Sequence, residues 1–313
     1  MQFKNFKQKA VWAGLLFVIC SSFSLLRPSI YNRTDWHKDG LQGRVKVLTV
    51  KEYAATSVST QQDELLESSI RYYNEQGFLT EIKEFNGDGT LAQRQVFVYT
   101  KKETRREELF YDENGALFEK IITKLNFAGS PIQSVVMDAH GNVQEKNTYQ
   151  YDEKERLLKQ SGYDASGKLA EKSYYTYQND VLNQYLSFSE YENKKILYKY
   201  DAQKNPVELL VYHSKTNVFL KKVTQEFDRN KNLITANYWD EKNILKSSVS
   251  YKYDEKDNLL EYIVLDIDKS ILDMFSFVYQ YDRYSNWIGQ TVYKGREKQI
   301  ESRMERIIAY YEE

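Results

Sequence analysis

Short runs in which apolar and polar residues alternate cover most of the chain. At 147–151, Tyr149 and Tyr151 fall on one face of an extended backbone, with polar side chains on the other. This period of two residues is typical of β-strands with one buried face. Residues 41–51 predict the first strand of a sheet, and residues 303–311 predict a last strand that closes its edge. Residues 61–69 are polar and contain no turn motif, so we expect a loop or a short helix there.

A turn motif separates these runs at regular intervals. Its first class reads Tyr-Asp, two residues, Gly or Asn, one residue and Leu, most clearly at 111–117 and 163–169, with a partial copy at 74–79. Its second class reads Tyr-x-Tyr-Asp and places an Asn one position later, as at 198–205 and 251–258. First-class turns begin at 86, 112, 138 and 164, and continue near 190, 214, 240, 266 and 294. Second-class turns fall between them, so the chain is a tandem array of repeats of about 26 residues.

Each position of the motif has a physical reason. Asp at the start of a turn can accept a hydrogen bond from a backbone amide two residues later. Gly or Asn near its end supplies a positive φ, and such turns join antiparallel strands. Each repeat is then two strands and two turns, with first-class turns along one sheet edge and second-class turns along the other. We therefore predict an all-β fold, an antiparallel β-meander of tandem two-strand repeats, curled into a shell, an open barrel or a two-layer sheet.

The N-terminal segment has the composition of an export signal. Three lysines precede an apolar run at 11–19, and small residues follow it up to Ser24. Cleavage after Ser24 is one expected outcome, and lipid attachment at Cys20 is the alternative. The protein is then exported to the periplasm, the cell surface or the medium, with membrane contact only through the signal or a lipid on Cys20. The predicted organisation is a signal peptide over 1–24, a linker over 25–39 and the repeat domain over 40–313.

Composition and charge remove several functional classes. Charged residues make up 28% of the chain with both signs intermixed, so no nucleic-acid-binding stripe is expected. The single cysteine allows no internal disulfide, and His37, His140 and His213 are too scattered for a zinc motif. Most recurring carboxylates are turn-start aspartates, and their role in the turn accounts for them. We therefore expect no catalytic residue, no metal site, no cofactor and no enzyme activity.

Aromatic side chains are the best candidates for ligand contacts. They make up 15% of the chain, which has 27 tyrosines. Trp and Tyr beside turns can stack on sugar rings or anchor a protein partner. We predict such contacts at Tyr238, Trp239, Tyr284 and Trp287. These residues lie where copies depart from the regular repeat, and residues 187–195 are a further place of that kind.

The Tyr-Asp-x-x-Gly-x-Leu motif resembles the YD repeat of bacterial Rhs-type proteins. The opening at 40–45 and the phrase at 281–287 are similar to those of uncharacterised exported proteins of Bacteroidetes-type bacteria. The resemblance covers about residues 40–311 and implies a spiralling antiparallel β-sheet. In large Rhs proteins this sheet forms a hollow shell around a C-terminal toxin. We find no toxin domain and no Asp-Pro-containing self-cleavage core in this sequence, so toxin delivery is not expected.

These features predict a non-catalytic exported repeat protein of the cell envelope. It would bind a glycan or an envelope protein, or act as a scaffold. The alternative is a structural or immunity-type repeat protein that neutralises a secreted toxin. Neighbouring genes would separate the two, because a toxin gene favours the second and a polysaccharide-use cluster favours the first.

Overall fold

The computed structural model describes residues 34–54, 64–100 and 105–312, which form one short helix and twenty strands. The predicted signal peptide and Cys20 lie outside the described residues. The elements are α2 (Asp35–Lys38), β1 (Val45–Ala54), β2 (Leu65–Tyr73), β3 (Leu79–Asn86), β4 (Leu91–Tyr99), β5 (Arg105–Tyr111), β6 (Leu117–Leu125), β7 (Pro131–Asp138), β8 (Val143–Tyr151), β9 (Leu157–Asp164), β10 (Leu169–Gln178), β11 (Val181–Ser189), β12 (Asn193–Tyr200), β13 (Pro206–His213), β14 (Phe219–Phe227), β15 (Leu233–Trp239), β16 (Leu245–Tyr253), β17 (Leu259–Asp266), β18 (Ile271–Tyr281), β19 (Trp287–Lys294) and β20 (Gln299–Tyr310).

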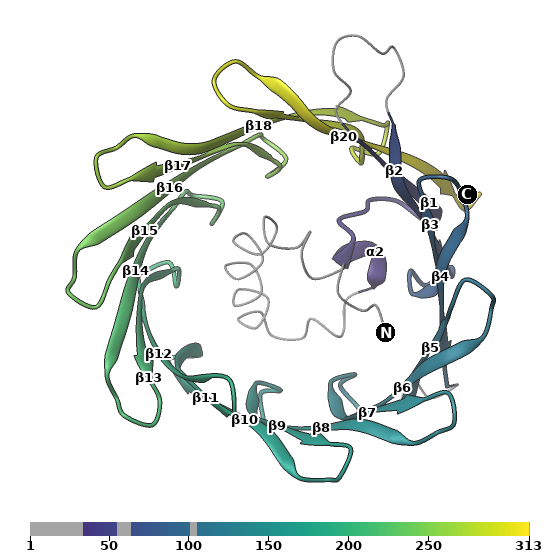
Figure 1. Ribbon diagram of the computed structural model, residues 1–313, viewed down its shortest axis with the longest axis horizontal. Helices are drawn as coiled ribbons and strands as arrows, with labels where there is room; N and C mark the ends of the chain where they lie inside the picture. The colour runs from purple at the N-terminus through teal and green to yellow at the C-terminus, as the bar shows by residue number, and fades with distance from the viewer. Residues whose placement is uncertain (1–33, 55–63, 101–104, 313) are drawn as a thin grey trace.

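The strands form a closed antiparallel barrel. Each strand pairs with the next along the chain, and β1 also pairs with β20, so the first and last strands complete the ring (Figure 1). In this closing register Leu48 of β1 lies opposite Ile308 of β20 and Arg71 of β2. The predicted all-β meander is confirmed, as are the predicted first and last strands, and the sheet is fully closed.

The expectation of a loop or short helix at 61–69 was wrong from Leu65 onward, where β2 begins. Residues 67–69 of this strand are polar, yet the strand is hydrogen-bonded on both sides, by β1 and by β3. The two ladders satisfy its backbone groups, so pairing overrides the weak strand propensity of the sequence.

The turns occupy two opposite rims. We call the rim with the turns that follow even-numbered strands the even rim, and the other the odd rim. First-class turns such as those at 112 and 164 lie at the odd rim, and second-class turns such as those at 201 and 254 lie at the even rim. The prediction of one class per edge is therefore confirmed. The copy at 74–79 is an exception, because it has first-class spacing but joins β2 to β3 at the even rim.

Turn chemistry follows the predicted columns with one correction. In the first class, Asp112 Oδ1 accepts hydrogen bonds from the amides of Asn114 at 3.0 Å and Ala116 at 2.8 Å. Gly115 has the positive φ, 77°. In the second class the positive φ belongs to the residue before the Asn, as in Asp257 at 62°. The Asn acts through its side chain instead, whose Nδ2 donates hydrogen bonds to other groups.

Asn258 shows what the second-class Asn does. Its Nδ2 donates to Asp254 Oδ2 at 3.1 Å and to the hydroxyl of Tyr281, in the next even-rim hairpin, at 2.8 Å. Tyrosines of the second class tie neighbouring hairpins together in another way. The hydroxyls of Tyr177 and Tyr200 donate to the carbonyls of Leu157 and Leu182, at 3.0 and 2.7 Å. A shift of register disrupts the ladder beside each of these carbonyls, in the β8–β9 pairing at Leu157 and in the β10–β11 pairing at Leu182, and the hydroxyl supplies a donor there.

The inner face of the barrel is identified by α2, which lies within the ring (Figure 1). Tyr73 donates to Asp39 Oδ2 at 2.5 Å, Arg71 pairs with the same carboxylate, and Tyr99 contacts Asp35. The four-residue α2 is the helix of the described residues, and it is far too short to cross a membrane.

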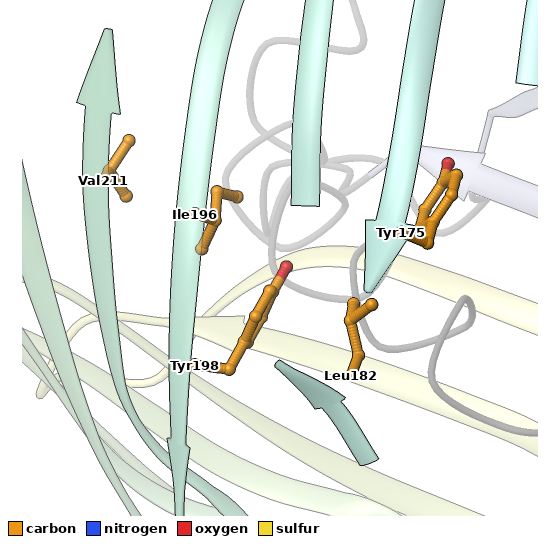
Figure 2. Close-up of a cluster of buried hydrophobic side chains, with 5 residues drawn as sticks. All are labelled: Tyr175, Leu182, Ile196, Tyr198 and Val211. Carbon is orange, nitrogen blue, oxygen red and sulfur yellow. The ribbon is translucent and has the colours of Figure 1, made fainter. Parts of the chain in front are cut away.

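Followed through the register from strand to strand, the same face carries the buried clusters of the wall. Figure 2 shows one of them, in which β10 to β13 contribute the side chains Tyr175, Leu182, Ile196, Tyr198 and Val211. Tyrosines before even-rim turns therefore point inward. Tyrosines before odd-rim turns, such as Tyr163 and Tyr212, point outward.

The turn aspartates predict how stability responds to acid. Hydrogen bonds from the Asn142 side chain and from turn amides lower the pKa of Asp138, and those from Ser166 and Lys168 do so at Asp164. Because these pKa values are lower in the folded state, the stabilisation is present above the unfolded value of about 4 and is lost as the pH falls below it. We expect the thermal midpoint to drop between pH 5 and pH 2.5. Asp138→Asn should drop less, and a midpoint that holds or rises in acid would contradict the assignment.

Candidate binding surface on the outer wall

The four aromatic candidates do not form one site. Tyr238 and Trp239 are neighbours on β15, so their side chains point to opposite faces. Tyr238 packs on the inner face with Ala236 and Val249, and burial raises the pKa of its hydroxyl to about 12. Trp239 points outward, where its Nε1 donates to Thr224 Oγ1 at 3.4 Å.

Tyr284 and Trp287 lie at the even rim, where the first and last strands meet. The Tyr284 ring is 4.4 Å from the Tyr310 ring, measured between centroids, and it also faces Gly43. The Arg306 guanidinium lies 3.4 Å from the centre of the Trp287 ring. Both aromatic side chains therefore contact the closing strand β20 or the segment before β1.

Trp239 belongs to a recurring outward pair that the structure brings together. On six successive strand pairs, the last outward side chain before the odd rim is aromatic or Met, and a Lys or Arg lies directly opposite it. We call this row the basic belt. Its pairs are Arg94 with Tyr111, Lys120 with Met137, Lys146 with Tyr163, Lys172 with Phe188, Lys195 with Tyr212, and Lys222 with Trp239.

In three of these pairs the cation covers the ring. Lys222 Nζ lies 4.4 Å from the centre of the Trp239 ring, and Lys195 Nζ lies 5.4 Å from that of Tyr212. The Arg94 guanidinium lies 5.2 Å from the centre of the Tyr111 ring. These are cation–π distances, so the ring holds the charge in place on the outer wall.

The belt carries positive charge that the wall does not neutralise. Arg94 and Lys120 pair with Glu81 and Glu107, each at 2.5 Å. Within the described part of the chain, the other four lysines form no ion pair with a carboxylate; they are Lys146, Lys172, Lys195 and Lys222. Outward lysines nearer the even rim differ, since Lys199 and Lys252 pair with Glu208 and Glu261 at 2.5 and 2.6 Å.

The belt has defined ends. It runs from β4 to β15, which is twelve of the twenty strands. Beyond it, a serine takes the place of the cation opposite the outward apolar residue. These pairs are Ser248 with Leu265, Ser276 with Tyr293, and Ser68 with Phe85. This row of cations is therefore confined to one arc of the ring.

A groove opens where the belt meets the irregular turn between β11 and β12. Its volume is about 1060 Å³, and the belt residues Tyr163, Lys172 and Phe188 contribute to its lining. Tyr191, at the tip of the turn, also lines it and is 93% exposed, so its ring is free to contact another molecule. The groove overlaps residues 187–195, where the repeat loses its regular turn.

Part of this surface is visible in the sequence. Arg94, Lys120, Lys146 and Lys172 recur every 26 residues, in step with the turns. Five of the six cations precede their outward partner by seventeen residues, and Lys172 precedes Phe188 by sixteen because only two residues separate β10 from β11. A basic column was therefore readable. That it faces outward, opposite the aromatic column, requires the register.

Metal and catalytic residues were not expected from the sequence. In the described ranges, no three His, Cys, Asp or Glu side chains gather closely enough to hold a metal ion. The recurring aspartates bond instead to the amides of their own turns, as Asp240 does with Lys242 and Ile244, each at 2.9 Å.

No protein family matches the sequence, and no curated protein matches it. Among solved structures, a porin-like protein from Bacteroides uniformis is similar over 86% of this chain and 99% of its own, with 14% identity and a TM-score of 0.38. A porin-like protein from Bacteroides vulgatus is similar over 85% and 99%, with 12% identity and a TM-score of 0.28. TcdB2-TccC3 without its hypervariable C-terminal region is similar over 80% of this chain but 15% of its own, with 10% identity and a TM-score of 0.32.

Proposed function

We propose that this protein is a non-catalytic, exported binding module of the cell envelope that holds an extended partner, a glycan, on the outer wall of its barrel. The observation that carries the proposal is the basic belt, in which six cations lie in register along one arc, five opposite an aromatic ring and one opposite Met137. Binding hot spots are enriched in aromatic rings and in Arg side chains. The barrel itself acts as the rigid scaffold that fixes the spacing of these pairs.

The belt is not needed to hold the barrel together. Its side chains lie on the outer face, while the buried clusters lie on the inner one. A structural role for an outward lysine is met by a cross-strand glutamate, as at Lys199 and Lys252. Four belt lysines have no such partner in the described residues, which leaves their charge available for a ligand.

A glycan array probed with the mature protein and with belt variants tests the proposal. In one variant Lys222→Ala and Trp239→Ala remove a complete pair, and we expect affinity for the retained glycan to fall about tenfold. The matched control removes Tyr72 and Lys83, a cation–ring pair at 5.4 Å that faces outward beyond the belt. The control should bind as the parent does. Absence of any retained glycan, or equal losses in both variants, would overturn the proposal.

A further inference from the structure

We infer that the ligand of the basic belt is an acidic polysaccharide, laid along the outer wall so that successive acidic groups meet successive cations. This inference rests on the proposed function and assigns the chemical class of the glycan. Three features of the belt carry it: which group the wall presents outermost, how the cations are spaced, and how the wall curves.

In the pairs where the cation covers the ring, the cation is the outermost group. Because the Lys222 ammonium lies over the Trp239 ring and that of Lys195 over Tyr212, a chain approaching these pairs meets positive charge before it meets a free ring face. A carboxylate, sulfate or phosphate gains a charge-assisted contact there. The ring at the side of each cation then packs against the C–H surface of the sugar that carries the acidic group.

Negative charge at the odd rim restricts where such a chain can lie. Turn-start residues including Asp138 and Asp164 have lowered pKa values, because hydrogen bonds from their own turns favour the charged form. They are therefore ionised at neutral pH and repel an acidic chain from the tips of the turns. The favourable path is the outer wall just below them, where the belt lies.

The spacing matches a polymer with regularly repeated charges. Belt pairs occur on every second strand, so neighbouring cations are separated by about 10 Å around the wall, two interstrand distances. Four of the cations have no carboxylate partner in the described residues, and they are consecutive around the ring: Lys146, Lys172, Lys195 and Lys222. A chain with acidic groups at that interval neutralises one cation per repeat.

The curvature of the wall selects a flexible chain. The belt covers twelve of twenty strands, more than half of a convex ring. A membrane or the surface of a folded acidic protein is nearly flat on this scale and touches only a short part of that arc. A flexible polymer can follow the whole belt and engage its cations together, which gives avidity without any single strong contact.

The central comparison is between two polymers that share one backbone, dextran and dextran sulfate. Dextran is neutral and dextran sulfate is acidic; polygalacturonate supplies a carboxylate polymer, and poly-L-glutamate and anionic lipid vesicles represent other acidic partners. We expect the mature protein to bind dextran sulfate and polygalacturonate, to ignore dextran, and to bind less tightly as salt is raised. In a belt variant with Lys146, Lys172, Lys195 and Lys222 changed to Ala, affinity should fall about 100-fold, from four exposed charge contacts.

The control variant changes four outward lysines that already pair with glutamates; they are Lys51, Lys83, Lys199 and Lys252. It removes the same net charge as the belt variant. Because these lysines already pair with glutamates and are not part of the belt, the control should bind nearly as the parent does. Equal losses in the two variants would show a general charge effect and overturn the inference. Equal binding of dextran and dextran sulfate would overturn the acidic class while leaving the proposed glycan-binding function intact. Poly-L-glutamate or vesicles bound as tightly as the polysaccharides would overturn the assignment to a polysaccharide, whereas failure to bind any glycan removes the proposed function itself.

Discussion

Replacing Asn286 with alanine is expected to lower the free energy of unfolding by about 3 kcal/mol, about 1 for each hydrogen bond lost. Its side chain is 1% exposed. Its Oδ1 accepts from the Gln42 amide at 2.7 Å, and its Nδ2 donates to the Gln42 carbonyl at 2.9 Å and the Tyr310 hydroxyl at 2.7 Å. One side chain thus joins three segments: the turn after β18, the residues before β1 and the end of β20. Equilibrium unfolding in urea measures the change.

The control for Asn286 is Asn258→Ala, in the same column of the preceding even-rim turn. Asn258 bonds to Asp254 of its own turn and to Tyr281 of the adjoining hairpin, both within the array. It does not link the two ends of the sheet, and we expect about half the loss. Equal destabilisation of the two variants would show that the link made by Asn286 between the two ends of the sheet adds no stability beyond that of an ordinary even-rim turn.

Leu48→Ala is expected to cost about 4 kcal/mol of unfolding free energy, within the range for a fully buried leucine whose site cannot collapse. Leu48 is 0% exposed and belongs to a cluster with Val45 and Tyr73. It lies on β1, the strand that pairs with both β2 and β20, so neighbours on both sides limit relaxation into the cavity. The midpoints of thermal unfolding and of urea unfolding should both fall.

Val98→Ala is the matched control for Leu48→Ala. Val98 is in β4 but lies on the outer face and is 46% exposed, so its loss should change stability by no more than about 0.5 kcal/mol. A loss at Leu48 as small as that at Val98 would mean that the closing strand contributes little to the core. The main stabilising contacts would then lie among the other strands of the barrel.

Local features of the fold were predictable because their causes are local. A turn-start Asp bonds to amides two and four residues away, as Asp112 does, and alternation along a strand needs only neighbouring residues. The misread features depend on distant partners. Residues from Leu65 are a strand because β1 and β3 flank them. Asn258 of the second class bonds to a tyrosine 23 residues away, so its full role could not be read from its own turn.

The binding surface divides in the same way. The period of the cations and the positions of Trp239 and Tyr238 are in the sequence, but a shift of one residue exchanges the two faces of a strand. Only pairing showed that Trp239 joins Lys222 outside while Tyr238 packs inside. Tyr284 and Trp287 likewise became part of the seam only when β20 was placed beside β1 and β19.

The sequence by itself determined an all-β array, its repeat of about 26 residues, and two classes of turn on two edges, because hydrogen bonds within each turn and the period of each strand set these features. The tertiary structure alone decided that the array closes, which face is inner, and which charged and aromatic columns meet. Closure depends on pairing β1 with β20, whose paired residues are 248 to 265 positions apart. No local interaction encodes that contact: it arises when the accumulated curvature of twenty strands brings the two free edges together and both gain their missing hydrogen bonds.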